Sequence, residues 1–138
     1  NAKNLLKNEG YTCVLCKGAQ LYTSRSTGIS PMLDFLEENT DLNGFSAADK
    51  IVGKAAAMLF ALAGVTELYA EVLSRNAVSV LEIYGIRYSY GILTERIINR
   101  RGDGICPMEE TVAETTNLQE AFYALLQKRK QLKKGDIV

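Results

Sequence analysis

The sequence predicts an α/β domain in which helices pack on both faces of one central sheet. Helix-like and strand-like segments alternate along the 138 residues, and 47% of the residues are hydrophobic, enough to build a sizeable core. After residue 65 a strand-like, a helix-like and a second strand-like segment follow one another, an order typical of a crossover between parallel strands. We therefore expect a single domain spanning residues 1–138.

Caps, prolines and glycines mark the boundaries of the expected elements. Gly10 ends the first helix, and a Lys-Gly-Ala turn at residues 17–19 joins two β-rich segments into a hairpin. Ser30 is expected to cap a helix that starts at Pro31. In chain order we expect a helix over 2–9, strands over 11–17 and 19–24, helices over 31–39 and 46–63, a strand over 65–73, a helix over 74–84, extended chain over 86–98, and helices from 107 and over 117–134.

Glycines and polar caps also organise the second half of the chain. Gly64 is expected to end the buried helix, and Ser74 to cap the helix that follows the strand. Gly91 interrupts the extended segment, which predicts two strands joined by a β-turn. A short helix opens at Pro107, and an amphipathic helix that opens at Asn117 completes the fold.

The segment from Ser46 to Ala63 is the most informative part of the sequence. It is apolar on every side from Ala55 onward, and a helix that is apolar all round is a buried helix. Its charged residues stand in the first two turns, where Ser46 is expected as the N-cap with Asp49 three residues later, as in a capping box. Charges gathered at one end of a buried helix indicate that this end faces a cleft.

We expect that cleft to bind an anion. Lys50 and Lys54 are one turn apart on the same helical face, and Gly53 between them permits close approach of a ligand. The free N–H groups and the dipole of a helix start favour a phosphate or a carboxylate. The alternative is that both lysines are solvated and that Asp49 only caps the helix.

Cys106, at the start of the short helix, is the candidate nucleophile. A helix start stabilises a thiolate, and the nearby Arg100 and Arg101 would add to this effect. Glu109 could exchange a proton with a ligand, and so could Asp49 in the first site. The alternative is that Cys106 is a small buried residue and that Glu109 satisfies the helix dipole.

Two further segments could line the same cleft. Ser74 opens the helix after the strand, and in a parallel sheet this opening lies beside the start of the buried helix, where α/β sheets place ligands. The loop that contains Asn99 and Arg100 could hold an anion or close over it. The alternatives are an ordinary cap and a plain surface loop. Cys13 and Cys16 are expected in the core, on opposite faces of one strand.

Composition excludes several classes of function. The chain has no histidine, which removes Ser-His-Asp and Cys-His catalysis and the commonest zinc ligand, and no pattern indicates a metal site or a cofactor. Its 16 basic and 16 acidic residues give no net charge, so no long-range field attracts nucleic acid or a membrane. We expect neither partner, although the basic run at 128–134 leaves RNA binding as an alternative.

Three cysteines, an odd number without zinc-type spacing, favour a reducing and cytoplasmic location. No apolar run reaches the roughly 20 residues of a membrane span, and the first residues are too polar for a signal peptide. Because the chain starts with Asn and not with Met, we expect that a few leading residues are missing. The sequence leaves open whether the chain forms a homo-oligomer.

Several strings resemble a prokaryotic family of uncharacterised proteins, domain of unknown function 1893. They run from the first hairpin to Glu110, and the most specific are the Asp-Lys-Ile-Val-Gly-Lys-Ala-Ala string from Asp49 and the Cys-Pro-Met-Glu string from Cys106. The resemblance implies a cytidine-deaminase-like fold, a three-layer α-β-α sandwich with a mixed central sheet. Zinc deaminases hold their metal at the starts of two central helices, and the segments from Ser46 and Ser74 lack the required His and Cys. We therefore expect the pocket without the zinc chemistry.

The main hypothesis is a pocket at the helix starts for a small anionic or nucleotide-like molecule. The ligand-binding candidates are Ser46, Lys50, Gly53, Lys54, Ser74, Asn99 and Arg100. In an enzymatic version Cys106 is the nucleophile, Glu109 the acid or base, and Asp49 orients the ligand or exchanges protons. A binding or sensor domain would use the same pocket without turnover. A structural or interaction module that works through the last helix is the remaining alternative.

Overall fold

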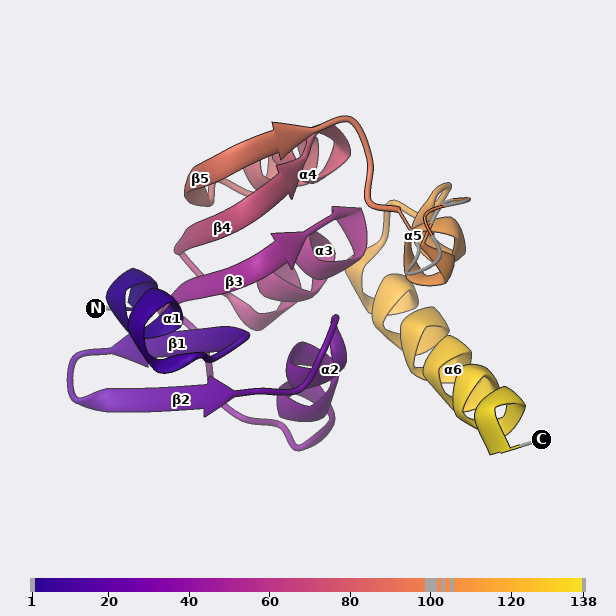
Figure 1. The fold of residues 1–138 in the computed structure, drawn as a ribbon, viewed down its shortest axis with the longest axis horizontal. Coiled ribbons are helices and arrows are strands. Elements are labelled where there is room, and N and C mark those ends of the chain that lie inside the picture. The colour runs from indigo at the N-terminus through magenta and orange to yellow at the C-terminus, as the bar shows by residue number, and fades with distance from the viewer. Residues whose placement is uncertain (1, 99–101, 103, 105, 138) are drawn as a thin grey trace.

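Five strands form one mixed sheet at the centre of the chain (Figure 1). A computed structural model describes residues 2–98, 102, 104 and 106–137. The strands are β1 (Cys13–Lys17), β2 (Gln20–Ser24), β3 (Ser46–Val52), β4 (Glu67–Ser74) and β5 (Arg87–Thr94). Their order is β2-β1-β3-β4-β5, with β1 antiparallel to both of its neighbours and β3, β4 and β5 parallel to one another. The predicted mixed α/β sheet is therefore confirmed.

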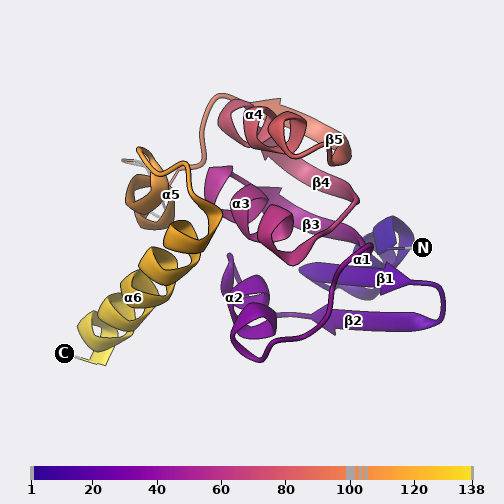
Figure 2. The ribbon, with the colours of Figure 1, turned by 180° about the vertical axis from the view of Figure 1, so that it is seen from behind.

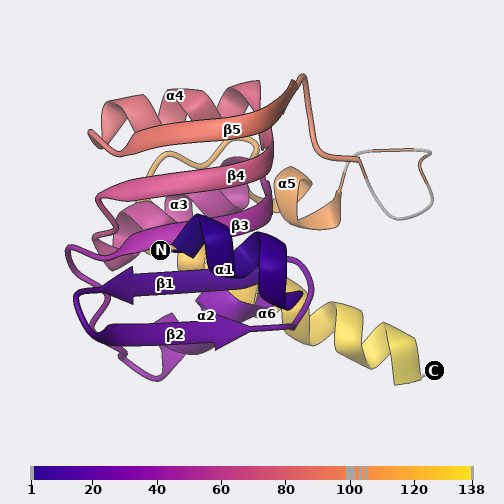
Figure 3. The same cartoon turned by 60° about the vertical axis from the view of Figure 1, so that its left-hand side comes forward.

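Helices cover the sheet unequally. They are α1 (Ala2–Glu9), α2 (Ser30–Glu37), α3 (Lys54–Ala63), α4 (Arg75–Ile83), α5 (Pro107–Val112) and α6 (Leu118–Ile137). Helix α1 lies on one face, whereas α3 and α4 lie side by side on the other face with α2 nearby (Figures 2 and 3). No helix in the described part of the chain combines the length and the apolarity that crossing a membrane requires.

The core is divided between the two faces of the sheet. The larger cluster surrounds α3, whose Met58, Leu59 and Phe60 are all buried, as the apolar run predicts. The smaller cluster joins Leu6 of α1 to Val14 of β1 and to neighbouring side chains of β3 and β4. The first halves of β3 and β4 are covered on both faces, where Ala47 and Leu68 face the larger cluster and Ala48 and Tyr69 the smaller one, whereas Lys50 and Glu71 in the second halves stay partly exposed.

The expected helix over residues 46–63 begins at Lys54, and the prediction for its first part is wrong. Residues Ser46–Val52 form β3, which pairs with β1 on one side and with β4 on the other. Ala, Asp and Lys favour a helix or a loop over a strand, but a central strand satisfies its backbone on both edges and buries Ala47 and Ala48 on opposite faces. Ser46 is therefore not a helix cap.

The expected break at Gly91 is also absent, because Arg87–Thr94 is one continuous strand. A Cβ atom at Gly91 would lie 2.9 Å from the carbonyl oxygen of Glu71, so the missing side chain lets β5 approach β4 closely. The glycine here marks close strand packing and not a turn.

Most of the predicted caps are confirmed. Gly64 ends α3 with a left-handed φ of 84°. Ser74 caps α4, and the side chain of Asn117 accepts a hydrogen bond of 3.0 Å from the N–H of Glu120 at the start of α6. At α2 the cap is Ile29, one residue before the expected Ser30, and its side chain makes no capping bond. Cys13 is buried and Cys16 is half-buried against the opposite cluster.

Candidate functional site

The starts of α3 and α4 meet at one edge of the sheet. Parallel strands β3 and β4 end at Val52 and Ser74, and each chain turns directly into the helix behind the sheet. Helices α3 and α4 then run side by side. The carboxyl edge of parallel strands is where α/β sheets bind ligands, so this is the place to look for a site.

The start of α3 is already occupied by a carboxylate of this chain. Glu109 of α5 accepts hydrogen bonds from the N–H of Lys54 at 2.8 Å and from the N–H of Ala55 at 2.7 Å, one on each oxygen. The carboxylate is 8% exposed. It satisfies N–H groups that the first turn of a helix leaves without partners, and its charge complements the helix dipole. An external anion would have to displace Glu109 to reach these N–H groups.

Gly53 makes room for that carboxylate. A Cβ atom at this position would lie 2.6 Å from Cδ of Glu109 and 2.8 Å from Cγ1 of Ile97. Its φ of −101° is open to any residue, so the glycine is needed for space and not for backbone conformation. The close approach that the sequence predicted at Gly53 does occur, but the group that approaches is Glu109.

A groove lies between α3 and α4, next to these helix starts, with a volume of about 340 Å³. Its polar side chains are Lys54, Asn76, Ser79, Tyr84, Thr115 and Thr116, and its apolar ones are Met58, Val80 and Ile83. Lys54 is the one charged residue among them. Its Nζ donates a hydrogen bond of 2.9 Å to the carbonyl oxygen of Ala113, which leaves two ammonium hydrogens for other acceptors.

The far end of the groove exposes apolar surface. Ile83 is 76% exposed and Tyr84 is 45% exposed, although both are large hydrophobic side chains. The groove therefore offers an ammonium at the helix starts and an uncovered apolar wall toward the end of α4. This combination suits a small molecule with an anionic group and an apolar or aromatic body.

Ser74 holds the start of α4. The Oγ atom is fully buried, accepts a hydrogen bond of 3.2 Å from the N–H of Ala77 and lies 2.5 Å from Oδ1 of Asn76. Asn76 lines the groove. Ser74 thus acts on the groove through Asn76, and its own hydroxyl is enclosed.

Cys106 precedes Glu109 by three residues at the start of α5, and it is not among the residues that line the groove. It is the half-buried N-cap of α5, its N–H donates to the carbonyl oxygen of Ile97 at 3.2 Å, and Pro107 follows as predicted. The structure therefore brings α5, and with it Glu109, to the start of α3. Asn99 and Arg100 lie outside the described residues, as does Arg101.

Three predicted site residues belong to β3 instead of to a helix. Ser46 begins the strand, so a seven-residue strand of about 20 Å separates it from the start of α3. Lys50 faces the α1 side of the sheet, where its Nζ lies 4.0 Å from Glu71 in an exposed ion pair. The predicted grouping of Lys50 with Lys54 on one helical face is wrong, because Lys50 lies in a strand.

Asp49 faces the other way, into the main core. It pairs in register with Cys13 of β1, and Oδ1 accepts a hydrogen bond of 2.8 Å from the N–H of Lys50. Burial raises the pKa of Asp49 well above its usual range, while hydrogen bonds from the Lys50 and Ile51 N–H groups act in the opposite direction. Burial also raises the pKa of the Cys13 thiol, and the charge of Asp49 adds to this rise.

Sequence reasoning missed several groove residues. Asn76 lies two residues after the predicted cap Ser74, and Thr115 and Thr116 form a short polar stretch before α6, so the sequence gave a weak indication of each. The capping role of Glu109 carried no signal, because 54 residues separate it from Ala55.

The fold and the groove define an α/β protein with a cavity of small-molecule size at the carboxyl edge of its parallel strands. The chain belongs to the family described as a domain of unknown function (DUF1893), whose model matches residues 1–129. It is similar to a crystal structure of a DUF1893 family protein (TM1506) from Thermotoga maritima at 2.70 Å resolution. The two share 26% identity with a TM-score of 0.83, over 92% of this chain and 86% of that chain. No curated protein matches the chain significantly.

Proposed function

We propose that this chain binds a small anionic or nucleotide-like molecule in the groove between α3 and α4. The observation that carries the proposal is the pairing of the Lys54 ammonium, which keeps two hydrogens beyond its bond to Ala113, with an exposed apolar wall in a cavity of about 340 Å³. The anionic group of the ligand contacts Nζ of Lys54. Its apolar body covers Ile83 and Tyr84, which otherwise stay in water at a cost of about 25 cal/mol per Å².

The position of the anion follows from Glu109. Because the carboxylate already takes the N–H groups of Lys54 and Ala55, the helix start gives little to an incoming phosphate. The side chain of Lys54 donates a hydrogen bond to the carbonyl oxygen of Ala113 and lines the groove. Charge-assisted hydrogen bonds from such an ammonium are the strongest contacts that the described lining can offer to a phosphate.

The strand order and the two helices that start at neighbouring strand ends support a cytidine-deaminase-like fold. In zinc deaminases the metal is held by His and Cys at such helix starts. The corresponding residues here are Gly53 and Lys54 at α3 and Ser74, Arg75 and Asn76 at α4, none of which suits that role. No cluster of three potential metal ligands exists in the part of the chain that the structure describes. The donor set does not fit zinc, so the proposal contains no zinc-dependent step.

An enzymatic version uses Cys106 as the nucleophile and Glu109 as the acid or base. Its support is the half-buried Cys106 at the start of α5, three residues from Glu109. Asp49 has no part in it, because that side chain faces the core. If Cys106→Ser abolishes product formation without changing ligand affinity, the enzymatic version stands; if turnover persists, it fails.

Binding itself is tested by calorimetry and thermal shift with the four common nucleoside monophosphates, their nucleosides and inorganic phosphate. We expect a monophosphate to bind, and Lys54→Gln to weaken it about 10-fold or more, since a charge-assisted hydrogen bond contributes about 1.5–3 kcal/mol. Ser79→Phe, which fills the groove from an exposed position on α4, should abolish binding.

Lys130→Gln is the matched control, because Lys130 is an exposed lysine on α6 away from the groove. Equal affinities for the Lys54 and Lys130 variants, or unchanged binding by the Ser79→Phe protein, would contradict the proposal. Saturating ligand should raise stability by RT ln(1 + [L]/Kd), which is about 2.7 kcal/mol at a 100-fold excess over Kd.

A further inference from the structure

A second hollow lies at the opposite end of the sheet from the groove. It has a volume of about 240 Å³ and sits beside α1, where β3, β4 and β5 begin. Its polar lining consists of Lys3, Cys16, Ser46, Glu67, Tyr69 and Ser89. The register explains the gathering: Cys16 pairs with Ser46, Ser46 with Glu67, and Tyr69 with Ser89.

Two opposite charges line this hollow without neutralising each other. Lys3 Nζ stands 4.6 Å from the centre of the Tyr69 ring, which holds the ammonium at the wall of the hollow by a cation–π contact. Glu67 precedes Tyr69 by two residues on β4, so both side chains point to the same face about 7 Å apart. Among the described residues neither Lys3 nor Glu67 forms an ion pair.

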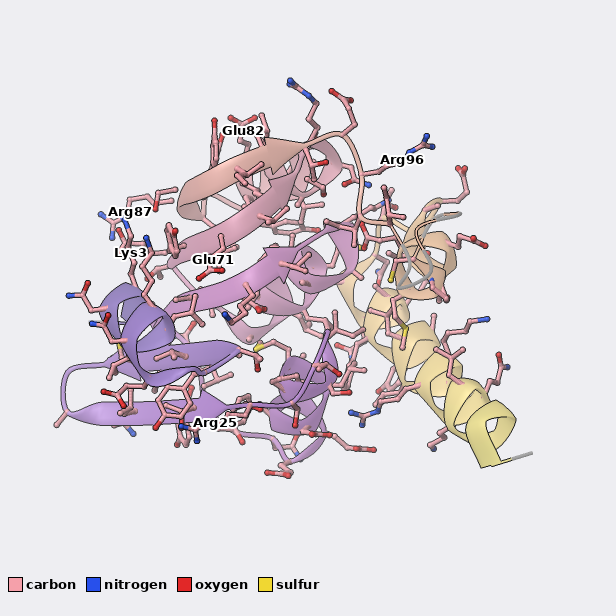
Figure 4. The ribbon with its side chains drawn as sticks, in the orientation of Figure 1. Lys3, Arg25, Glu71, Glu82, Arg87 and Arg96 are labelled. Atoms are coloured by element: carbon pink, nitrogen blue, oxygen red, sulfur yellow. The ribbon has the colours of Figure 1, made fainter. Side chains whose placement is uncertain are left out.

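A third charged residue, Arg87, stands next to this pair of charges. Arg87 of β5 lies directly opposite Glu67 in the strand register, and Figure 4 shows Lys3 and Arg87 at the same end of the sheet. Arg87 is therefore a direct neighbour of Glu67, whereas Lys3 is held at the Tyr69 ring. Lys3 offers a partner to a carboxylate, Glu67 offers a partner to an ammonium, and the hydroxyl groups of Ser46 and Ser89 supply neutral hydrogen bonds.

We propose that this hollow binds a zwitterion of the α-amino-acid class, with its carboxylate toward Lys3 and its ammonium toward Glu67. An ammonium and a carboxylate on one carbon can each form a charge-assisted hydrogen bond of about 2.8 Å, one to Glu67 and one to Lys3. The hollow is smaller than the roughly 300–1,000 Å³ of sites for drug-sized molecules, which fits a ligand of a few heavy atoms. The full length of β3 separates this site from the groove, so it does not rest on the function proposed above.

The test is an NMR titration of the 15N-labelled full chain with L-alanine, L-serine, propionate and ethylamine, each up to about 20 mM, a range that detects millimolar Kd values. We expect the amino acids to shift the amide signals of Ser46, Glu67 and Ser89 saturably. Propionate and ethylamine, which carry one charge each, should bind at least 10-fold more weakly. Glu67→Gln and Lys3→Gln should each weaken the amino acids by at least 10-fold.

The matched controls are Glu38→Gln and Lys130→Gln, which remove the same charges at exposed positions outside the hollow. All four variants change exposed side chains, so folding should persist, as circular dichroism can verify. Propionate binding as tightly as alanine would reduce the site to a simple anion site and overturn the proposal. So would unchanged affinity in both hollow variants, or the absence of any saturable shift with the amino acids.

Discussion

Helices α3 and α4 begin at the same edge of the sheet, but their first turns are held in different ways. At α4 the cap is local: Ser74 bonds the N–H of Ala77, three residues later. At α3 the cap residue is Gly53, which has no side chain. The N–H groups of Lys54 and Ala55 donate instead to the carboxylate of Glu109 on another helix. The comparison shows that a helix end can be satisfied by neighbouring sequence or by tertiary contact, and that only the first leaves a pattern in the sequence.

The two starts also differ in charge. A carboxylate neutralises the dipole at α3, whereas α4 has a neutral hydroxyl as its cap. The groove between them takes its positive charge from the side chain of Lys54 and not from a bare helix end. The proposed anion site therefore depends on a lysine ammonium. Variants of Glu109, Gly53 and Ser74 measure how much each cap contributes to the stability of the two helix starts.

The largest effect is expected from Glu109→Ala. This change leaves the N–H groups of Lys54 and Ala55 without acceptors in a buried place, and we expect a loss of about 3 kcal/mol in unfolding free energy. Denaturant unfolding measures it. Glu109→Gln keeps the shape and one acceptor oxygen and should cost less. An Ala variant as stable as the wild type would show that α3 does not depend on this distant cap.

Gly53→Ala should have the next largest effect, a loss of about 2 kcal/mol, because a methyl group would overlap Glu109 and Ile97. The reason is steric, so the cost should fall by about 1 kcal/mol when Glu109 is already Ala. Chemical denaturation of both single variants and the double variant measures this coupling. Simple additivity would mean that Gly53 matters for some reason other than the room it gives to the carboxylate.

Ser74→Ala should cost about 1 kcal/mol, as expected for the loss of a local helix cap. We expect this loss to be smaller than that of Glu109→Ala, because the bonds of Ser74 to Ala77 and Asn76 are between neutral groups, whereas both bonds of Glu109 involve a charge. Thermal unfolding measures both. Ser79→Ala, at an exposed position on the same helix, is the control and should change stability by less than about 0.5 kcal/mol.

The smallest effect is expected from Asp49→Asn, and its sign is the opposite of the others near neutral pH. Burial raises the pKa of Asp49 in the folded chain, so at pH values between the ordinary and the raised pKa the folded state holds a proton that the unfolded state has released. The stability that Asp49 contributes is fully present below the ordinary carboxyl pKa of about 4. It is lost as pH rises through the raised pKa of Asp49 in the folded chain. Asn carries no charge to desolvate and should therefore stabilise the protein at pH 8, with a gap that closes toward pH 4.

Urea unfolding of wild type and Asp49→Asn across that pH range measures the gap. An Asp49 that capped a helix would instead make the Asn variant less stable at pH 8. A difference that stays constant with pH would mean that Asp49 has the same pKa in the folded and unfolded chains.

Much of the fold was open to prediction because its signals are local. The signals that were read correctly involve residues only a few positions apart: the apolar run of α3 and the caps Gly64, Ser74 and Asn117. The failures came where pairing partners are distant. Residues 46–52 have a helix-like composition, and Gly91 looks like a break, yet contacts with β1 and β4 make both parts of continuous strands.

The structure brings together some of the predicted site residues, in a geometry that differs from the predicted one. Sequence reasoning named Gly53, Lys54 and Glu109, and the structure does bring them together. It also named Lys50 and Ser46, which the strand carries to the α1 face and to the far end of the sheet. A shift from helix to strand changes the side-chain period from 3.6 to 2, so residues expected on one face are separated.

The sequence carries the α/β order outside residues 46–52, the buried helix from Lys54 and the caps Gly64, Ser74 and Asn117, because periodicity and turn chemistry act over a few residues. That residues 46–52 form a strand and that Glu109 closes the start of α3 depends on the assembled fold. Both features depend on groups far apart in the chain. Their hydrogen bonds form only when the sheet assembles, so no local sequence pattern predicts them.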